Sequence, residues 1–418
     1  MPLRDEAVAI GKRAKQAASR LAQISADEKN RVLLRMADAL SEQQWLLLDA
    51  NQKDLEAARR AKVPPALLDR IALDPSRIHA MAKGIREVAA LPDPVREIVK
   101  MWRRPNGLQV GRMRIPLGVI AIIYEARPNV TGDAAVLCLK SGNAVILRGG
   151  SEAFFSNQAI GEVLRAACRD TEVPEESIQV VQSKDRGMVY ELLQLDNYVD
   201  LVIPRGGEEL IASVTANSRV PVVKHFKGVC HVYIDSEASL EMAERISMNA
   251  KVQRPSVCNA METLLVNQAV APKFLPAVIV KLQQAGVEIR GCEKTRALVP
   301  GVKAATEADW TTEYLDLILS VRVVEDMDEA IDHIERYGSQ HTEAIVTSDY
   351  ARSREFIDRV NSSAVMVNAS TRFNDGGELG LGAEIGISTS KIHAFGPMGL
   401  EELTVTKFVV LGDGQIRE

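Results

Sequence analysis

The stretch Val119-Ile120-Ala121-Ile122-Ile123 is a continuous apolar run, and it decides the predicted fold. A run of this kind is typical of a parallel strand that is buried on both faces. We expect a helix to follow it as far as Lys140, and then strands over 144–147, 178–182 and 199–203, each with a helix behind it. Strands that alternate with helices predict a doubly wound α/β domain.

Ligands of such domains bind beyond the carboxyl ends of the strands. In this sequence those ends are 124–131, 148–151 and 204–207. Each holds a glycine, an arginine or a residue that starts a helix, which suits phosphate binding. The two usual phosphate fingerprints, Gly-x-Gly-x-x-Gly and Gly-x-x-x-x-Gly-Lys-Ser/Thr, do not occur. We therefore expect any bound nucleotide to be held by a different arrangement.

The chain on either side of this domain supplies helices and a small β ribbon. Residues 1 to about 91 read as helical, and Ser25 to Glu28 fits a helix-capping box. Pro105-Asn106-Gly107 lies between two β-prone runs and predicts a hairpin, which is either a subunit contact or an ordinary edge hairpin. The segment 403–411 is also β-prone, and a lone terminal strand needs a partner, for which a neighbouring subunit is one candidate.

A second α/β unit is expected from about Asp235, and it contains Cys258. This cysteine falls on an irregular segment between a helical run, 240–251, and an apolar strand, 263–266, so it is held by a scaffold and still accessible. Arg254, four residues upstream, can favour the thiolate, which is the nucleophilic form. The alternative is a small buried thiol in a helix–strand joint, because cysteine is among the most buried residue types.

Composition excludes several classes of function. A net charge of −5, from 51 basic and 56 acidic residues, offers no basic face for nucleic acid, and an aromatic content of 4% leaves few side chains for base stacking. The five cysteines include no Cys-x-x-Cys pair, so we expect no metal site and a reducing, cytoplasmic compartment. No apolar run could span a membrane, and residues 1–15 lack an apolar signal core, so we expect a soluble intracellular protein.

Cys230 and His231 are adjacent and resemble a nucleophile–base pair. Neighbouring residues of a strand point to opposite faces, so we expect no catalysis by this pair. A metal site formed by these two residues and His225 is not expected either.

Long motifs along nearly the whole chain resemble the aldehyde dehydrogenase superfamily. Residues 122–130, Ile-Ile-Tyr-Glu-Ala-Arg-Pro-Asn-Val, are similar to that family's strand ending in an asparagine, and 140–152 look like its next strand and cofactor loop. Residues 252–260, Val-Gln-Arg-Pro-Ser-Val-Cys-Asn-Ala, are most similar to the branch that reduces L-glutamyl 5-phosphate in proline biosynthesis. The segments 222–235 and 330–343 resemble the same branch.

The resemblance implies an aldehyde dehydrogenase-like fold of two doubly wound α/β domains and a small β oligomerisation ribbon. The domains expected are a cofactor-binding domain over 1–96 and 119–234, a catalytic domain over 235–370, a loop over 371–402 that returns to the cofactor domain, and a ribbon formed by the hairpin 97–118 and the tail strand 403–418. The hairpin and the tail strand favour a homodimer or a homotetramer.

The implied reaction takes L-glutamyl 5-phosphate and NADPH to L-glutamate 5-semialdehyde, NADP+ and phosphate. Cys258 would attack the acyl phosphate and form a thioester, which splits one difficult step into two. The Asn129 amide and the Cys258 backbone N–H would hold the oxyanion. If Asn129 does not have this role, it would cap the helix that follows.

The resemblance also assigns residues to the cofactor. Arg148 and Ser151 would lie in the cofactor loop, and Arg148 replaces a lysine of many members. A guanidinium binds phosphate bidentately, so we expect NADPH rather than NADH. Gly206 and Gly207 would let a pyrophosphate approach the backbone, unless they form a plain tight turn. Glu313 would hold the nicotinamide ribose.

The remaining assignments concern the substrate and the base. Arg127, Arg254 and Arg372 are candidates for the substrate's phosphate and carboxylate. His225, or Lys224 if the register slips by one, stands where hydrolytic members carry a glutamate base. The absence of that glutamate favours phosphate over water as the partner that exchanges the acyl group. The alternatives are a hydrolytic or coenzyme-A-linked aldehyde dehydrogenase and a non-catalytic scaffold. A glutamate 5-kinase is a possible partner that delivers the labile acyl phosphate.

Overall fold

The structure is a computed structural model that describes residues 2–224 and 227–417. The chain divides into two compact units. The first unit comprises Met1–Lys224, Gly380–Gly386 and Met398–Glu418, and the second comprises His225–Leu379 and Ile387–Pro397. In neither described range is a helix long and apolar enough to cross a membrane.

Helices fill the first part of the first unit, as the sequence predicts. The helices of this unit are α1 (Leu3–Leu21), α2 (Ala26–Glu42), α3 (Gln44–Arg60), α4 (Pro65–Ile71), α5 (Pro75–Ala90), α6 (Asn129–Lys140), α7 (Phe154–Ala167), α8 (Gly187–Leu193) and α9 (Glu208–Asn217), with short 3₁₀ turns η1 (Ser151–Ala153) and η2 (Glu175–Ser177). Helix α2 begins at the predicted cap, where the Ser25 hydroxyl accepts a hydrogen bond from the Glu28 N–H at 3.2 Å.

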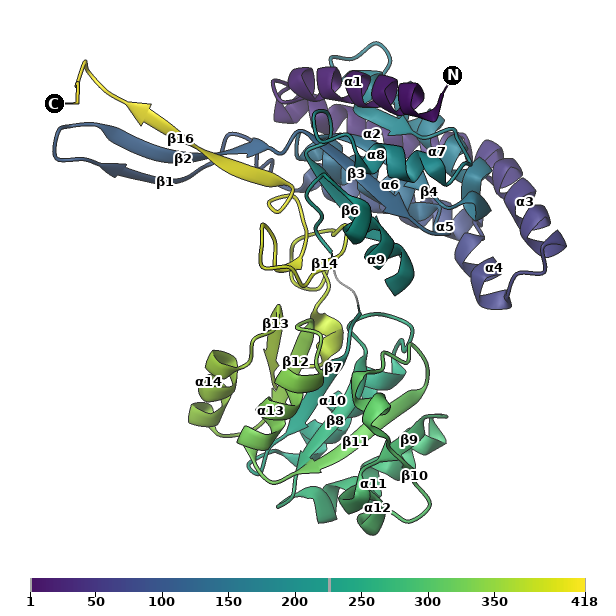
Figure 1. The fold of residues 1–418 in the computed structure, drawn as a ribbon, viewed down its shortest axis with the longest axis vertical. Coiled ribbons are helices and arrows are strands. Elements are labelled where there is room, and N and C mark those ends of the chain that lie inside the picture. The colour runs from purple at the N-terminus through teal and green to yellow at the C-terminus, as the bar shows by residue number, and fades with distance from the viewer. Residues whose placement is uncertain (1, 225–226, 418) are drawn as a thin grey trace. The chain divides into compact units, whose positions relative to one another are not determined.

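The first sheet is parallel and has the strand order β5-β4-β3-β6 (Figure 1). Its strands are β3 (Val119–Tyr124), β4 (Ala144–Gly149), β5 (Ile178–Val180) and β6 (Leu201–Arg205). Every residue of β3 is buried, as the continuous apolar run predicts. The chain adds β4 and β5 on one side of β3 and then places β6 on the other. The strand order therefore reverses between β3 and β6, and ligands of open α/β sheets bind outside such a point.

Alternate residues of β3 serve two layers of helices. Val119, Ala121 and Ile123 lie in one apolar cluster with side chains of α1 and α8. Helices α6 and α7 pack on the sheet as well, and α2, α3 and α5 pack against them in turn.

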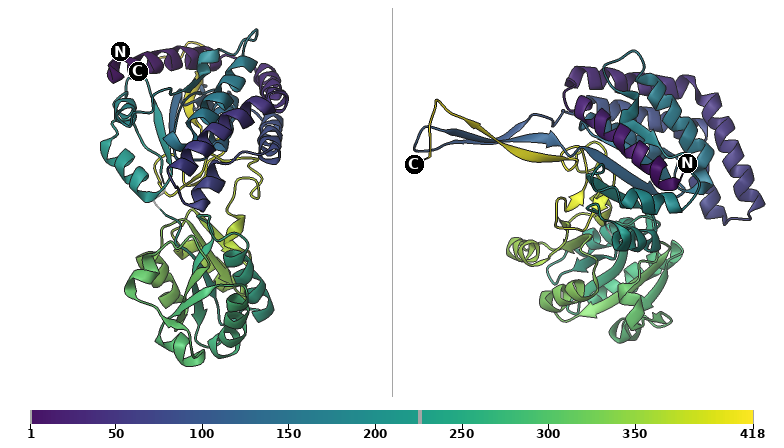
Figure 2. Two further views of the ribbon diagram at one scale, coloured as in Figure 1. Left: turned by 90° about the vertical axis from the view of Figure 1, so that its right-hand side faces the viewer. Right: turned by 45° about the horizontal axis from the view of Figure 1, so that its top comes forward.

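An antiparallel arm with strand order β1-β2-β16 belongs to the first unit and extends away from its sheet and helices (Figures 1 and 2). Its strands are β1 (Ile98–Arg103), β2 (Gln109–Pro116) and β16 (Thr404–Leu411). The predicted hairpin is confirmed, and Gly107 adopts a φ of 94° in its turn. The tail strand, for which we considered a neighbouring subunit as partner, instead pairs along its full length with β2 of the same chain.

The second unit holds another parallel sheet, with strand order β10-β9-β11-β8-β7-β12-β13. Its strands are β7 (Cys230–Ile234), β8 (Met261–Asn267), β9 (Glu288–Gly291), β10 (Lys303–Ala304), β11 (Ile318–Val324), β12 (Thr342–Val346) and β13 (Ala364–Val367), with a separate antiparallel pair β14 (Ile387–Ser388) and β15 (Gly396–Pro397). The predicted domain boundary at 235 differs from this arrangement, because β7 is hydrogen-bonded between β8 and β12 and so belongs to the second unit.

Helices cover both faces of the second sheet. They are α10 (Leu240–Val252), α11 (Ala271–Gln284), α12 (Glu293–Leu298), α13 (Met327–Tyr337) and α14 (Tyr350–Arg359), with the short turns η3 (Glu307–Thr311) and η4 (Thr371–Phe373). One apolar cluster lies under α10 and α11, and another lies under α13 and α14.

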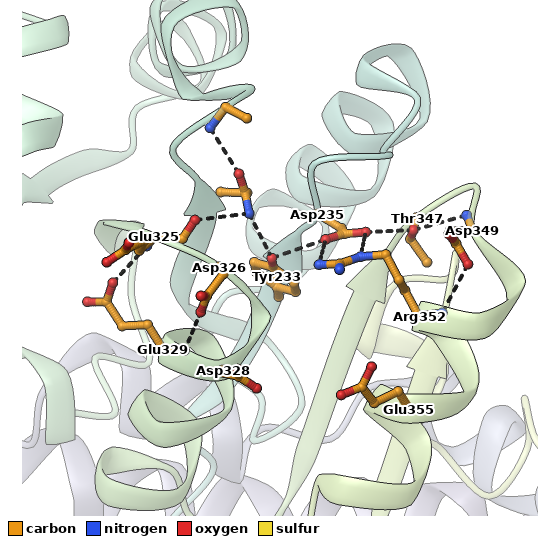
Figure 3. Close-up of polar contacts among 12 residues, drawn as sticks. Tyr233, Asp235, Glu325, Asp326, Asp328, Glu329, Thr347, Asp349, Arg352 and Glu355 are labelled. Carbon is orange, nitrogen blue, oxygen red and sulfur yellow. Dashed lines mark hydrogen bonds and ion pairs between the residues drawn. The ribbon is translucent and has the colours of Figure 1, made fainter.

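A buried ion pair fastens the carboxyl edge of the second sheet. Asp235, which directly follows β7, accepts hydrogen bonds from two guanidinium nitrogens of Arg352 at 2.7 and 2.5 Å (Figure 3). The hydroxyls of Tyr233 and Thr347 donate to the same carboxylate at 3.1 and 2.8 Å. These contacts tie β7, α14 and the end of β12 together.

Candidate active site

Cys258 lies on the irregular segment between α10 and β8 and is half-buried. Its backbone is in close contact with Gly228, which precedes β7. A Cβ placed on Gly228 would lie only 1.8 Å from the carbonyl oxygen of Cys258. Only glycine permits this approach, so the chain before β7 packs directly against the segment that carries Cys258, which we call the nucleophile loop.

Cys230 contacts the same loop from the first position of β7. Its thiol donates a hydrogen bond to the carbonyl oxygen of Cys258, with a sulfur–oxygen distance of 3.2 Å. His231 contacts Glu343 instead, through its backbone N–H at 2.9 Å and its Nδ1 at 2.8 Å. The two neighbours therefore point to opposite faces of the strand, as the sequence predicts.

Two of the predicted substrate arginines belong to the surroundings of Cys258. The Arg372 guanidinium donates to the side-chain oxygen of Asn259 and, at 2.9 Å, to that of Gln253. Burial lowers the pKa of Arg372, the charge of Arg254 lowers it further, and Cys258 acts in the opposite direction. Arginine stays charged despite such shifts. The structure thus brings Cys258, Arg254 and Arg372 within electrostatic range of one another.

Glu313 lies on the irregular segment between η3 and β11, and its carboxylate accepts the Gly228 N–H at 2.9 Å. A buried ion pair holds this segment. Lys251 lies 2.6 Å from one carboxylate oxygen of Glu262, and the other oxygen accepts the N–H of Leu315 at 3.2 Å. Burial raises the pKa of Glu262 to about 7.

Asn129 is the first residue of α6, in the first unit, and is exposed. Its amide nitrogen donates to the carboxylate of Asp133 at 3.0 Å rather than capping the helix backbone. Desolvation raises the pKa of Asp133 to about 6. Arg127, two residues before Asn129, is also exposed. Because Asn129 lies in the first unit and Cys258 in the second, their joint action on one oxyanion stays a prediction.

Arg148 lies near the carboxyl end of β4, and its side chain is turned inward. It donates to the carbonyl oxygens of Gly149, Lys184 and Asp185, the last two at 3.4 Å each. Only 8% of the residue is exposed, and its Nε has no hydrogen-bond partner among the described residues. Ser151 is exposed at the start of η1.

Gly206 and Gly207 connect β6 to α9 at the point where the strand order reverses. The N–H of Gly207 donates to the carboxylate of Glu125 at 3.0 Å. A Cβ on Gly206 would lie 2.5 Å from the carboxyl carbon of Glu125, so a larger residue there would displace the Glu125 side chain. A carboxylate of the chain itself therefore lies at the first turn of α9.

Comparison with known proteins agrees with this geometry. The aldehyde dehydrogenase family model matches residues 4–305. The chain belongs to the aldehyde dehydrogenase family. Gamma-glutamyl phosphate reductase of Moorella thermoacetica is 58% identical over 98% of both chains, and that of Geobacter metallireducens is 56% identical over 100% of both. The crystal structure of gamma-glutamyl phosphate reductase from Thermotoga maritima is 48% identical, covers 99% of this chain and 100% of its own, and superposes with a TM-score of 0.97.

These findings confirm the predicted aldehyde dehydrogenase-like fold and the predicted branch of the family. They do not test the roles of single residues. His225, the predicted replacement for the family's hydrolytic base, lies outside the described residues. Within the described ranges, no group of three or more His, Cys, Asp or Glu side chains could hold a metal ion.

Sequence reasoning missed several residues that shape the site of this family member. Gly228 and Cys230 were not assigned to the nucleophile, although both fall within the motif 222–235. Asn374 was not singled out, yet its carbonyl oxygen accepts the Asn259 amide at 2.9 Å. The one sequence signal for Gly228 and Cys230 was that both fall within the long motif 222–235.

Proposed function

We propose that this protein reduces L-glutamyl 5-phosphate to L-glutamate 5-semialdehyde and phosphate with NADPH, the second step of proline biosynthesis from glutamate. The observation that carries the proposal is similarity over the whole chain to relatives named gamma-glutamyl phosphate reductase. A hydrolytic or coenzyme-A-linked aldehyde dehydrogenase is not favoured, because solved structures of that kind are much less similar, such as an acetylating enzyme at 17% identity and a propionaldehyde dehydrogenase with bound CoA at 15%.

Cys258 is the proposed nucleophile. Its thiolate attacks the acyl carbon of the substrate, a carbon–sulfur bond forms, and the carbon–oxygen bond to phosphate breaks. The product is a thioester and free phosphate. The cationic charge of Arg254 and Arg372 favours the thiolate, which is the reactive form of cysteine.

The same arginines suit the negative charges of the substrate. A guanidinium binds phosphate or carboxylate through two parallel hydrogen bonds. We assign Arg254 and Arg372 to the substrate because they lie near Cys258, and Arg127 because it lies in the loop before Asn129. The Asn129 amide and the Cys258 N–H would hold the oxyanion, each worth ~3 kcal/mol of transition-state stabilisation. Asp133 fixes the orientation of that amide.

The residues at the carboxyl edge of the first sheet fit a dinucleotide phosphate. The buried Nε of Arg148 has no partner among the described residues, and the N–H of Gly207 at the start of α9 already donates to a carboxylate, that of Glu125. Arg148, Ser151, Gly206 and Gly207 would hold the phosphates, and Glu313 in the second unit would hold the nicotinamide ribose. When bound, NADPH supplies the hydride that reduces the thioester. The resulting thiohemiacetal anion expels the Cys258 thiolate and releases the aldehyde.

Assembly and location complete the proposal. The arm carries exposed apolar side chains, including Phe408 at 63% and Val410 at 55% exposure, which support a homodimer or homotetramer. A cytoplasmic location would keep the Cys258 thiol reduced. Direct delivery of the labile acyl phosphate by a glutamate 5-kinase is part of the same proposal.

The reverse reaction tests the function. Glutamate semialdehyde and NADP+ are supplied with and without phosphate, and NADPH absorbance is followed. We expect activity that requires phosphate and is lost in Cys258→Ala. Cys292→Ala is the matched control, because Cys292 is the other half-buried cysteine of the second unit among the described residues. Activity that ignores phosphate would show that water or another acceptor takes the acyl group, and full activity in Cys258→Ala would refute the thioester.

A further inference from the structure

Cys230 has a contact that the proposed mechanism does not use. It is fully buried at the first position of β7, and its thiol lies 3.2 Å from the carbonyl oxygen of Cys258. Gly228, two residues earlier, touches the same carbonyl group. Gly228 and Cys230 therefore both contact the backbone carbonyl group of the nucleophile.

The carbonyl oxygen of Cys258 lies nearer to the Cys230 sulfur than Nδ1 of His341 does. The Asn374 amide donates to the Thr342 hydroxyl oxygen at 2.7 Å, and Nδ1 of His341 lies 2.7 Å from the same oxygen. The sulfur of Cys230 lies 3.7 Å from that nitrogen and 3.2 Å from the carbonyl oxygen of Cys258. A carbonyl oxygen can only accept, so the shorter contact is a hydrogen bond that the Cys230 thiol donates.

A second set of bonds holds the next residue of the loop. The Asn259 amide donates to the carbonyl oxygen of Asn374 at 2.9 Å, and the Asn259 side-chain oxygen accepts from Arg372. Asn374 is the residue that also binds Thr342. The loop is therefore held at two successive residues, Cys258 and Asn259, by groups that meet at the start of β12.

We propose that Cys230 is a positioning residue for catalysis, whose thiol fixes the carbonyl of Cys258 and so keeps the nucleophilic sulfur beside Arg372. The inference rests on the proposed function, because it assigns Cys258 as the nucleophile. A fixed peptide also fixes the Cys258 side chain, and a misplacement of about 1 Å in an active site can cost about 100-fold in rate. Burial raises the pKa of the Cys230 thiol well above its ordinary value, so the thiol stays protonated and remains a donor.

The test compares Cys230→Ala, which loses the donor, with Cys230→Ser, which keeps one. Cys168→Ala is the matched control, since Cys168 is a buried thiol of the first unit that also donates to a backbone carbonyl, that of Leu164 at 3.6 Å. If the alanine variant does not fold, Cys230→Val fills the volume without a donor and takes its place. Each variant is measured for kcat, for KM, for Tm and for the pH dependence of Cys258 alkylation by iodoacetamide.

We expect Cys230→Ala to lower kcat about tenfold with KM changed by less than about twofold, and to raise the apparent pKa of Cys258 alkylation. Cys230→Ser should keep most of the wild-type kcat and an alkylation pKa close to the wild-type value. Cys168→Ala should change neither kcat nor that pKa. An unchanged alkylation profile in Cys230→Ala, or a serine variant as impaired as the alanine variant, would overturn the inference. Alkylation needs no turnover, so absent turnover in the wild-type protein would refute the proposed function alone.

Discussion

Replacing Gly228 by alanine tests the contact between the chain before β7 and the nucleophile. The new Cβ would lie 1.8 Å from the carbonyl oxygen, 2.6 Å from the carbonyl carbon and 2.9 Å from the Cα of Cys258. All three are backbone atoms, so no flexible side chain can turn away. Because real Cβ atoms approach other atoms no closer than 3.0 Å, the carbonyl oxygen has to move by the difference, about 1.2 Å.

The size of the expected effect follows from that displacement. A shift of about 1 Å at a reacting group costs about 100-fold in rate, which is ~2.7 kcal/mol in the activation free energy. Forcing one extra methyl group into a packed site lowers the free energy of unfolding by about 1–3 kcal/mol. We therefore expect Gly228→Ala to remain folded and to lose about 99% of kcat.

Phosphate-dependent NADPH formation measures kcat, and urea denaturation measures the free energy of unfolding. Gly84→Ala is the control, because Gly84 lies within α5 and a Cβ there would meet no atom within 4 Å. That variant should keep full activity and gain about 0.5–1 kcal/mol of stability. A Gly228→Ala protein with wild-type kcat would refute the argument that this contact sets the position of Cys258.

The other predictions concern buried charges and the first turn of α9. Burial lowers the pKa of His333 to about 2, so the ring stays neutral in the folded protein while the unfolded chain binds a proton below about pH 6.5. The neutral His333 ring should therefore contribute a loss of about 1.4 kcal/mol of stability per pH unit below pH 6.5, so the free energy of unfolding of His333→Phe should fall less steeply between pH 7 and pH 5 than that of the wild-type protein. Urea denaturation measures both curves, and parallel curves would disprove this. Lys251→Met leaves the Glu262 carboxylate buried without its cation and should lower the free energy of unfolding by about 3–5 kcal/mol. Adding Glu262→Leu to that variant should recover most of the loss, and a double variant no more stable than the single one would contradict the reasoning. Glu125→Ala removes the carboxylate that accepts the Gly207 N–H at the start of α9. The variant should bind NADPH about twofold to fivefold more tightly in calorimetry, because a carboxylate at a helix N-terminus is worth about 0.3–1 kcal/mol. The control Glu209→Gln removes an exposed charge from the same helix, and weaker binding in Glu125→Ala would instead make Glu125 a cofactor contact.

The regular elements were largely predictable because their signals are local. The apolar run 119–123 became β3, and the helix expected to run as far as Lys140 ends at that residue in the structure. Short strands at the sheet edge were not found: β9 reads Glu-Ile-Arg-Gly, which is brief and half polar. Such a segment becomes a strand because β11 and β10 pair with it on its two sides.

The candidate site also combines residues that the sequence indicates with contacts that it does not. Cys258 and Arg254 lie in the motif 252–260, so the sequence points to them directly, whereas Arg372 lies outside the quoted motifs. The approach of Gly228 to Cys258 joins positions thirty residues apart and depends on how β7 and β8 pack, which no local pattern encodes. The opposite faces of Cys230 and His231 were predicted correctly from strand geometry, but strand geometry alone does not say which face meets the nucleophile loop.

The pairing of β16 with β2 has a consequence for the order in which the chain folds during synthesis. Thr404 pairs with Pro116, so the arm cannot be completed until almost the whole chain has left the ribosome. The larger sheet lies entirely within residues 230–367 and can close earlier. Until β16 arrives, β1 and β2 form only a two-stranded hairpin, which is marginally stable in water. A ribosome stalled before residue 404 should thus carry a protease-resistant second unit and a protease-sensitive hairpin.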